Sequence, residues 1–202
     1  DLIEQHAYRA DRIDGPVERR IAHEGIVEAE TPEQTHDAIR NVLRSLGDNH
    51  SALISSDTMD SLDGGDDDHG DLDLRASVVG RHGYLRVPGF MGTDAARSDA
   101  YASAVHHGLS GLARQGVCGW IIDLRDNTGG NMYPMIRGLS GLLGEGTLGY
   151  FVDRDGREPW NIGLSAPGNA RPRDLPGGLD APVAVLSGPN TASSGEATLL
   201  SF

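Results

Sequence analysis

The sequence has no lysine: all 17 basic residues among its 202 are arginines. These residues therefore cannot supply the amine of a Schiff-base enzyme, the phosphate-binding lysine of a P-loop, or the base of a Ser–Lys protease. The 30 acidic residues give a formal net charge of −13, which argues against nucleic-acid binding because that depends on clustered positive charge. We expect the acidic surface to keep the protein in solution.

Cysteine and long apolar runs are also scarce. A single cysteine, Cys118, excludes an internal disulfide and a cysteine-based zinc cluster. No segment approaches the roughly 20 apolar residues of a membrane-spanning helix. The chain begins at Asp1 rather than Met and has no signal-peptide pattern, so we expect membrane contact only through a removed N-terminal anchor. The acid-rich residues 63–73 lack the spacing of a calcium loop; we expect no metal site and no cofactor.

The hydropathy pattern divides the chain into three parts. Residues 1–47 have helix signals and an apolar stripe that Gly47 ends, typical of a small helical subdomain. Residues 48–75 form a linker that includes the acidic run. Residues 76–202 alternate between strand-length apolar runs and helical patterns, which favours an α/β core. Strands are expected at 76–79, 84–87, 117–124, 148–152 and 182–186, the third and fifth of them buried, with a Pro/Gly/Arg-rich loop from 153 to 180.

Two expected strands end in unusual polar turns, where open α/β sheets usually place their sites. The sequence DLRDNTGG (123–130) contains a glycine pair, which allows backbone N–H groups to approach and bind an oxyanion. The sequence NTASSGE (190–196) places a serine at a strand–helix junction, in the positive field of the helix N-terminus. Each turn also has a purely structural interpretation, a glycine turn in the first and a capped helix in the second.

A serine nucleophile needs a base, and histidine is the natural candidate where lysine is absent. Among the eight histidines, His50 differs because it follows the helix end at Gly47 and precedes the apolar pair Leu53–Ile54, so it can project into a cleft. The alternative is an exposed histidine in a turn. Asp48 can orient the His50 ring, because residues i and i+2 face the same side of an extended chain.

Together these segments resemble family S41 of serine peptidases, the tail-specific or C-terminal processing proteases. The resemblance spans residues 31–202 and rests on GWIIDLRDNTGG (119–130), PVAVLSGPNTASSGE (182–196) and LGDNHS (46–51). It implies an α/β fold with a ClpP/crotonase-like core, preceded by a small N-terminal helical subdomain. The family fold continues past the TASSGE helix, so we expect a chain that ends at Phe202 to lack its C-terminal part.

The resemblance also implies roles for individual residues. Ser193, the serine after Thr-Ala, corresponds to the nucleophile, and Ser194, Gly129 and Gly130 line the oxyanion hole. The family has a lysine-base branch and a histidine-base branch, and the LxDxHS segment resembles the second, which makes His50 the base. The residues expected to orient the base or to hold the site in shape are Asp48, Asp123, Arg125, Asn127 and Glu196.

Within the family, the chain is most similar to the nisin-resistance-type subgroup. A GxGxxGYF-like stretch (144–151) follows the DLRxNxGGNMxPM segment, and no room is left for a PDZ domain. The resemblance implies a bacterial, extracytoplasmic serine endopeptidase that cleaves extended peptides, either lanthionine-containing peptides or protein tails. Two alternatives stay open: a non-catalytic ligand- or peptide-binding module on the same fold, and a crotonase that handles acyl-CoA. The sequence indicates no oligomeric state.

Overall fold

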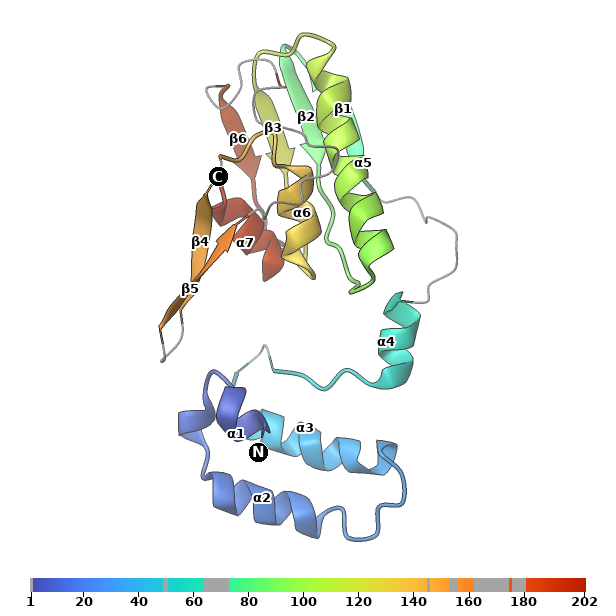
Figure 1. Ribbon diagram of the computed structural model, residues 1–202, viewed down its shortest axis with the longest axis vertical. Coiled ribbons are helices and arrows are strands. Elements are labelled where there is room, and N and C mark those ends of the chain that lie inside the picture. Colours follow the sequence, from blue (N-terminus) through green and yellow to red (C-terminus); the bar gives the residue numbers. More distant parts are fainter. Residues whose placement is uncertain are drawn as a thin grey trace. The chain divides into compact units, whose positions relative to one another are not determined.

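The computed structural model describes residues 2–48, 51–63, 73–144, 146–152, 156–161, 175 and 181–202 (Figure 1). The chain forms two compact units, Asp1–Gly64 and Gly65–Phe202. The division between them falls inside the segment 48–75, which the sequence suggests as a linker. Each unit is described by itself below.

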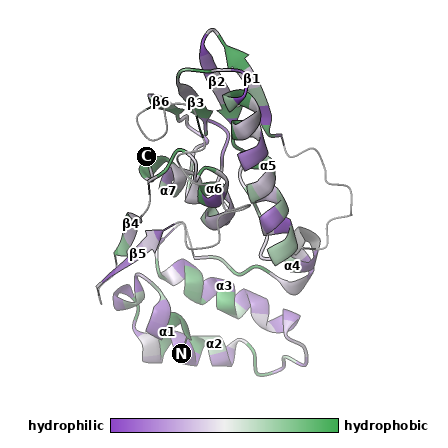
Figure 2. Ribbon diagram, turned by 45° about the horizontal axis from the view of Figure 1, so that its top comes forward, coloured by the Kyte–Doolittle hydropathy of each residue, from purple (hydrophilic) through white to green (hydrophobic). Residues whose placement is uncertain are grey.

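The first unit consists of short helices. In chain order they are α1 (Leu2–His6), η1 (Ala10–Arg12), α2 (Gly15–Glu24), η2 (Glu33–Thr35), α3 (His36–Ser45) and α4 (Ser56–Asp63). Helices α2 and α3 carry hydrophobic and hydrophilic residues side by side, as Figure 2 shows. The end of α3 agrees with the sequence, because Gly47 follows it with a φ of +63°. Within the described residues, no helix is both long and apolar enough to cross a membrane.

Helix α4 was not expected, because its residues lie in the segment assigned as linker. The missed signal is a cap: the Ser55 hydroxyl accepts a hydrogen bond from the N–H of Thr58 at 3.3 Å. A serine that satisfies an N–H of the first turn is typical of a helix start.

The second unit is a mixed α/β fold around a four-stranded sheet of order β1-β2-β3-β6. Strands β1 (Arg75–Val79) and β2 (His82–Arg86) pair antiparallel, whereas β2, β3 (Trp120–Asp123) and β6 (Val183–Leu186) run parallel. Strand β3 is in the interior of the sheet and mostly buried, as its apolar run predicts. Strand β6 is only partly buried, contrary to expectation, because it is the edge strand of the described sheet and is covered less.

Three helices accompany this sheet. Helix α5 (Ala95–Ala113) packs on β1 and β2, and α6 (Met132–Gly138) contacts both α5 and α7 (Ser194–Leu200) (Figure 1). Helix α5 buries one face, at the spacing that the sequence predicts: Tyr101, Ala102, Val105, Leu109 and Leu112. The sheet thus acquires an apolar core that holds the carboxyl ends of β3 and β6 at one edge.

A separate hairpin follows α6. It consists of β4 (Thr147–Val152) and β5 (Arg157–Asn161), which pair antiparallel. The sequence suggests a loop over β5, and this is wrong. The strand is not recognisable in the sequence because it contains Pro159 and two charged residues, and both proline and charge disfavour a strand assignment. Trp160 shows why it forms: its ring is buried and lies 4.9 Å from the ring of Phe151.

Candidate active site

Ser193 stands at the N-cap of α7, in the turn that follows β6. Its φ is +52°, and among the described residues no other non-glycine residue has a positive φ. Such backbone is uncommon for a residue with a side chain, and it is typical of the sharp strand-to-helix turns that hold nucleophilic serines. The Ser193 N–H donates to the Glu196 carboxylate at 3.2 Å, and the residue is exposed. The turn therefore presents the Ser193 hydroxyl at the surface.

Thr191 ties this turn to the end of β3. Its hydroxyl donates to the carbonyl of Leu124 at 2.7 Å and accepts from the N–H of Gly188 at 2.9 Å. Both polar functions of the hydroxyl are thereby used inside the fold. Thr191 therefore fixes where the serine turn begins, and it is not available as a nucleophile.

The predicted glycine turn lies directly against the serine turn. Gly129 and Gly130 have φ values of +102° and +109°, which side chains rarely allow. A Cβ on Gly129 would lie 2.9 Å from the Cβ of Ser193 and 3.0 Å from the nitrogen of Ser194. The Ser194 hydroxyl donates to the carbonyl of Gly130 at 2.5 Å. The structure thus brings together four residues that the sequence places in two segments.

Two backbone N–H groups of this cluster have no acceptor among the described residues. Within the described parts of the chain, the N–H groups of Gly130 and Ser194 donate to no protein acceptor. The N–H of Gly129, in contrast, donates to the side-chain oxygen of Asn127 at 2.9 Å. Free N–H donors beside a serine hydroxyl can bind a developing oxyanion. Gly130 and Ser194 are therefore the available donors, and Gly129 contributes its shape.

Asn127 is the buried residue that joins the two turns, with 1% of its surface exposed. Its side chain accepts from Gly129 and donates to the carbonyl of Val87 at 3.1 Å. Its own carbonyl accepts from the N–H of Ala192 at 3.1 Å. A Cβ on Gly195 would come within 2.5 Å of that carbonyl oxygen, so the start of α7 also packs on Asn127. This network gives Asn127 a positioning role that the sequence alone does not specify.

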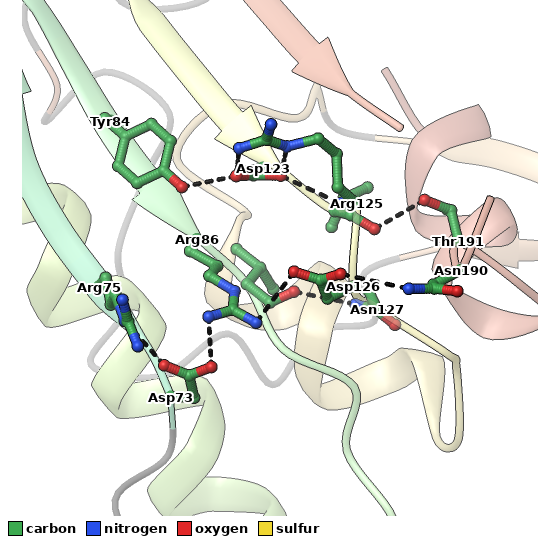
Figure 3. A network of polar contacts seen from close by, with 12 residues as sticks. Asp73, Arg75, Tyr84, Arg86, Asp123, Arg125, Asp126, Asn127, Asn190 and Thr191 are labelled. Carbon is green, nitrogen blue, oxygen red and sulfur yellow. Dashed lines mark hydrogen bonds and ion pairs between the residues drawn. The ribbon is translucent and has the colours of Figure 1, made fainter. Parts of the chain in front are cut away.

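Asp123 and Arg125 form a hydrogen-bonded pair at the end of β3 (Figure 3). The Arg125 guanidinium donates to both oxygens of the buried Asp123 carboxylate, at 3.0 and 2.7 Å, and the Arg125 N–H donates as well at 3.0 Å. The Tyr84 hydroxyl adds a further bond at 2.5 Å. The hydrogen bonds from Arg125 above all hold the pKa of Asp123 well below its usual range, despite burial. A carboxylate so stabilised shapes the turn and is a poor general base.

A second network, seen in Figure 3, was not predicted. The Asp126 carboxylate accepts from Arg86 at 3.1 Å and from the side chain of Asn190 at 3.4 Å. Arg86 is also paired with Asp73, which in turn accepts from Arg75 at 2.8 Å. The hairpin of β1 and β2 brings Arg75 and Arg86 together, but Asp126 and Asn190 come from distant segments that no spacing in the sequence joins to it. The network links the glycine turn to the serine turn from the outer side.

The predicted base, His50, lies outside the described residues. Its neighbour Asp48 accepts from the N–H of Ser51 at 2.6 Å and from the Ser51 hydroxyl at 2.9 Å. The Asp48 carboxylate is thus bonded to Ser51 through both the backbone and the side chain of that serine. Most of the acid-rich run, residues 64–72, also lies outside the described residues. In the parts that the structure does describe, no three His, Cys, Asp or Glu side chains converge as metal ligands would.

Comparison with known proteins gives a consistent result. Residues 81–202 match the model of peptidase family S41. The nisin-resistance protein of Lactococcus lactis subsp. lactis is 38% identical over 133 residues, which are 63% of this chain and 41% of that protein. The chain thus spans about two fifths of the length of this curated relative.

Two solved structures have the same fold. A lipoprotein from Streptococcus agalactiae matches with a TM-score of 0.82 and 24% identity, over 100% of this chain and 69% of that one. A putative peptidase from Parabacteroides merdae matches with a TM-score of 0.52 and 16% identity, over 99% and 68% of the two chains. At these identities the likeness establishes the fold, and it agrees with the expected mixed α/β architecture.

Proposed function

The chain belongs to peptidase family S41, and on this premise we propose that it is a serine endopeptidase with Ser193 as nucleophile and His50 as general base. The turn at Ser193 carries the proposal. Ser193 is exposed on a backbone with positive φ, and its turn lies against the glycine turn, where the N–H groups of Gly130 and Ser194 donate to no acceptor among the described residues. A nucleophile beside prearranged oxyanion donors is the arrangement that acyl transfer requires.

In the proposed reaction, His50 removes the proton of the Ser193 hydroxyl while the oxygen attacks a peptide carbonyl carbon. The negative charge that develops on the carbonyl oxygen is stabilised by the N–H groups of Gly130 and Ser194. The imidazolium then gives its proton to the departing amine, and an acyl-enzyme ester forms on Ser193. Water, activated by His50, hydrolyses this ester and restores the serine.

The other expected site residues support this centre. The Glu196 carboxylate accepts a hydrogen bond from the N–H of Ser193 and so holds the Ser193 backbone. Asn127 and Gly129 keep the serine turn and the glycine turn in contact. Asp48 accepts two hydrogen bonds from Ser51, and we assign it the role of orienting the base. We assign no proton transfer to Asp123, because its pKa is lowered.

We further propose that the substrates are extended peptides, and lanthionine-containing peptides among them. The name of the nisin-resistance relative supports this substrate class. The net charge of −13 suits a cationic peptide, because opposite charge raises the rate of encounter. A protein tail is the other substrate that the family resemblance suggests, and cleavage assays with both peptide types distinguish the two.

The proposed location is extracytoplasmic, with an anchor that lies outside this sequence. The description of the Streptococcus agalactiae relative as a lipoprotein supports it. Intact cells that produce the full-length protein test the proposal. A membrane-impermeant biotinylation reagent aimed at carboxylates should label the protein in intact cells, and labelling only after lysis would contradict the location.

A fluorophosphonate probe tests the catalytic proposal, because it reacts with activated serines. We expect labelling of Ser193, complete loss of it in Ser193→Ala, and labelling at least ~100-fold slower in His50→Ala. Ser187→Ala is the matched control, since Ser187 is also exposed and follows the same strand. A folded protein whose Ser193 stays unmodified would overturn the proposal. Peptide binding without labelling would favour the binding-module alternative.

A further inference from the structure

A half-exposed thioether lies beside the glycine turn of the proposed active site. A Cβ on Gly130 would meet the sulfur of Met91 at 2.9 Å, so the Met91 side chain lies over the Cα of Gly130. Half of Met91, 50%, remains exposed. An apolar side chain that lies against Gly130, whose N–H is a proposed oxyanion donor, and that is half exposed is placed to touch a bound substrate.

The backbone around Met91 is held in place by the glycine turn. The N–H of Phe90 donates to the carbonyl of Gly129 at 3.1 Å, and the N–H of Asn131 donates to the carbonyl of Phe90 at 2.7 Å. Phe90 and Gly130 form an isolated parallel bridge. The residue before Met91 is therefore bonded on both sides of Gly130, which fixes the backbone of Met91 beside the glycine turn.

The direction of the Met91 side chain follows from its neighbour. Phe90 is buried, with its ring 4.9 Å from that of Tyr101. Successive side chains of an extended segment point to opposite sides, so the burial of Phe90 turns Met91 outward. The exposure of Met91 is thus a property of the core packing and not of a loose loop.

We propose that Met91 is a specificity-determining residue: it contacts the side chain of the substrate residue whose carbonyl is attacked, and it favours an apolar side chain there. The inference rests on the proposed function. An oxygen held by the N–H of Gly130 lies ~3 Å from that nitrogen, and the side chain of the same substrate residue starts on the adjacent carbon. It therefore comes within reach of Met91, whose flexible, polarizable thioether adapts to apolar groups of different shape.

Diphenyl aminoalkylphosphonates test this contact. They carry one amino-acid side chain next to the reactive phosphorus, which the Ser193 oxygen attacks with loss of phenol. We compare the norleucine and glycine versions by their second-order rates of Ser193 labelling. Met91→Ala is expected to lower the norleucine-to-glycine ratio of rates about tenfold. Met91→Lys is expected to raise the aspartate-to-norleucine ratio of labelling rates about tenfold relative to the parent protein. Val79→Ala, equally exposed but on the far edge strand β1, should leave both ratios unchanged.

A fluorophosphonate without an amino-acid side chain distinguishes a failure of the proposed nucleophile, Ser193, from a failure of the proposed role of Met91. If it labels Ser193 equally in all variants while the ratios change as stated, both the nucleophile and the role of Met91 are supported. If it labels Ser193 but the ratios stay constant in the Met91 variants, the role of Met91 is overturned and the proposed function stands. If it does not label Ser193 in the parent protein, the proposed function fails and this inference fails with it.

Discussion

The side-chain oxygen of Asn127 accepts the N–H of Gly129 at 2.9 Å, and this bond decides which backbone donors of the glycine turn remain free. The Gly129 N–H is occupied inside the fold, whereas the N–H of Gly130 donates to no acceptor among the described residues and is the donor that the proposed function assigns to the substrate. A buried amide therefore orients the backbone of the turn without being able to reach a substrate itself.

Asn127→Ala should damage both the fold and the site. The substitution leaves the N–H of Gly129 and the carbonyl of Val87 without their partners, and unpaired buried polar groups cost about 1–3 kcal/mol each. We expect a loss of about 2–4 kcal/mol in the free energy of unfolding, measured with urea. We also expect fluorophosphonate labelling at least ~10-fold slower in the protein that remains folded, since the freed Gly129 N–H disturbs the turn.

Asn190→Ala is the matched control for this change. Asn190 is exposed, and its single described bond, to Asp126, is long at 3.4 Å. The variant should lose less than ~0.5 kcal/mol. Equal effects in the two variants would contradict a special role for Asn127.

Gly129→Ala should strongly slow the reaction of Ser193, because the added Cβ collides with the serine turn. The added Cβ would lie 2.9 Å from the Cβ of Ser193, and the φ of +102° strains any side chain. We expect a loss of about 1–3 kcal/mol in stability and labelling of Ser193 at least ~100-fold slower. Gly116→Ala separates the two causes, because Gly116 has a φ of +73° but nothing within 4 Å of a Cβ. The Gly116→Ala variant should be less stable but should label Ser193 at the parent rate. Slow labelling in both variants would mean that backbone strain, and not the collision with Ser193, is the cause.

Asp123→Asn should reveal a pH-dependent contribution to stability. The folded-state pKa of Asp123 is depressed, chiefly by the hydrogen bonds from Arg125, so the ion pair stabilises fully above the unfolded pKa of about 4 and less as the pH falls towards the folded value. We expect the variant to be about 1–2 kcal/mol less stable at pH 7, a figure reduced because Arg125 is half exposed. The difference should shrink in urea titrations below pH 4.

The exposed pair of Asp37 and Arg40 provides the comparison for Asp123. Its carboxylate is 90% exposed, so Asp37→Asn should change stability by less than ~0.5 kcal/mol at any pH. An Asp123→Asn variant whose deficit grows on acidification would contradict the sign derived above.

Glu196 should act through the backbone of Ser193 and not on the substrate. Glu196→Ala removes the acceptor of the Ser193 N–H and a negative charge at a helix N-terminus, and we expect about 0.5–1.5 kcal/mol less stability. Labelling of Ser193 should slow by about tenfold. Glu196→Gln retains an acceptor and should recover most of the rate; a glutamine variant as slow as the alanine variant would show that the charge is what matters.

The sequence predicts the centre of the second unit because its signals are local. The apolar run 117–124 gives β3, and the glycine pair that follows marks a turn whatever surrounds it. Strand β5 escapes prediction because burial of Trp160 against the neighbouring strand outweighs the unfavourable Pro159. That outcome depends on tertiary contact, which spacing does not record.

In the candidate site, too, the features with local signals are predictable and those that depend on tertiary contacts are not. The segments that supply Ser193 and the glycine turn are recognisable from their motifs, and the fold brings them together. The sequence does not reveal which backbone N–H groups of the glycine turn are left without an acceptor, because this depends on the hydrogen bond from the Gly129 N–H to the side chain of Asn127. The link from Arg86 to Asp126 likewise joins residues 40 positions apart.

The serine turn and the glycine turn are joined by bonds from Thr191 to Leu124, from Ala192 to Asn127, and from Ser194 to Gly130. The two turns therefore cannot slide past each other without breaking several bonds at once, so in the proposed mechanism the nucleophile and the oxyanion donors form one preassembled unit.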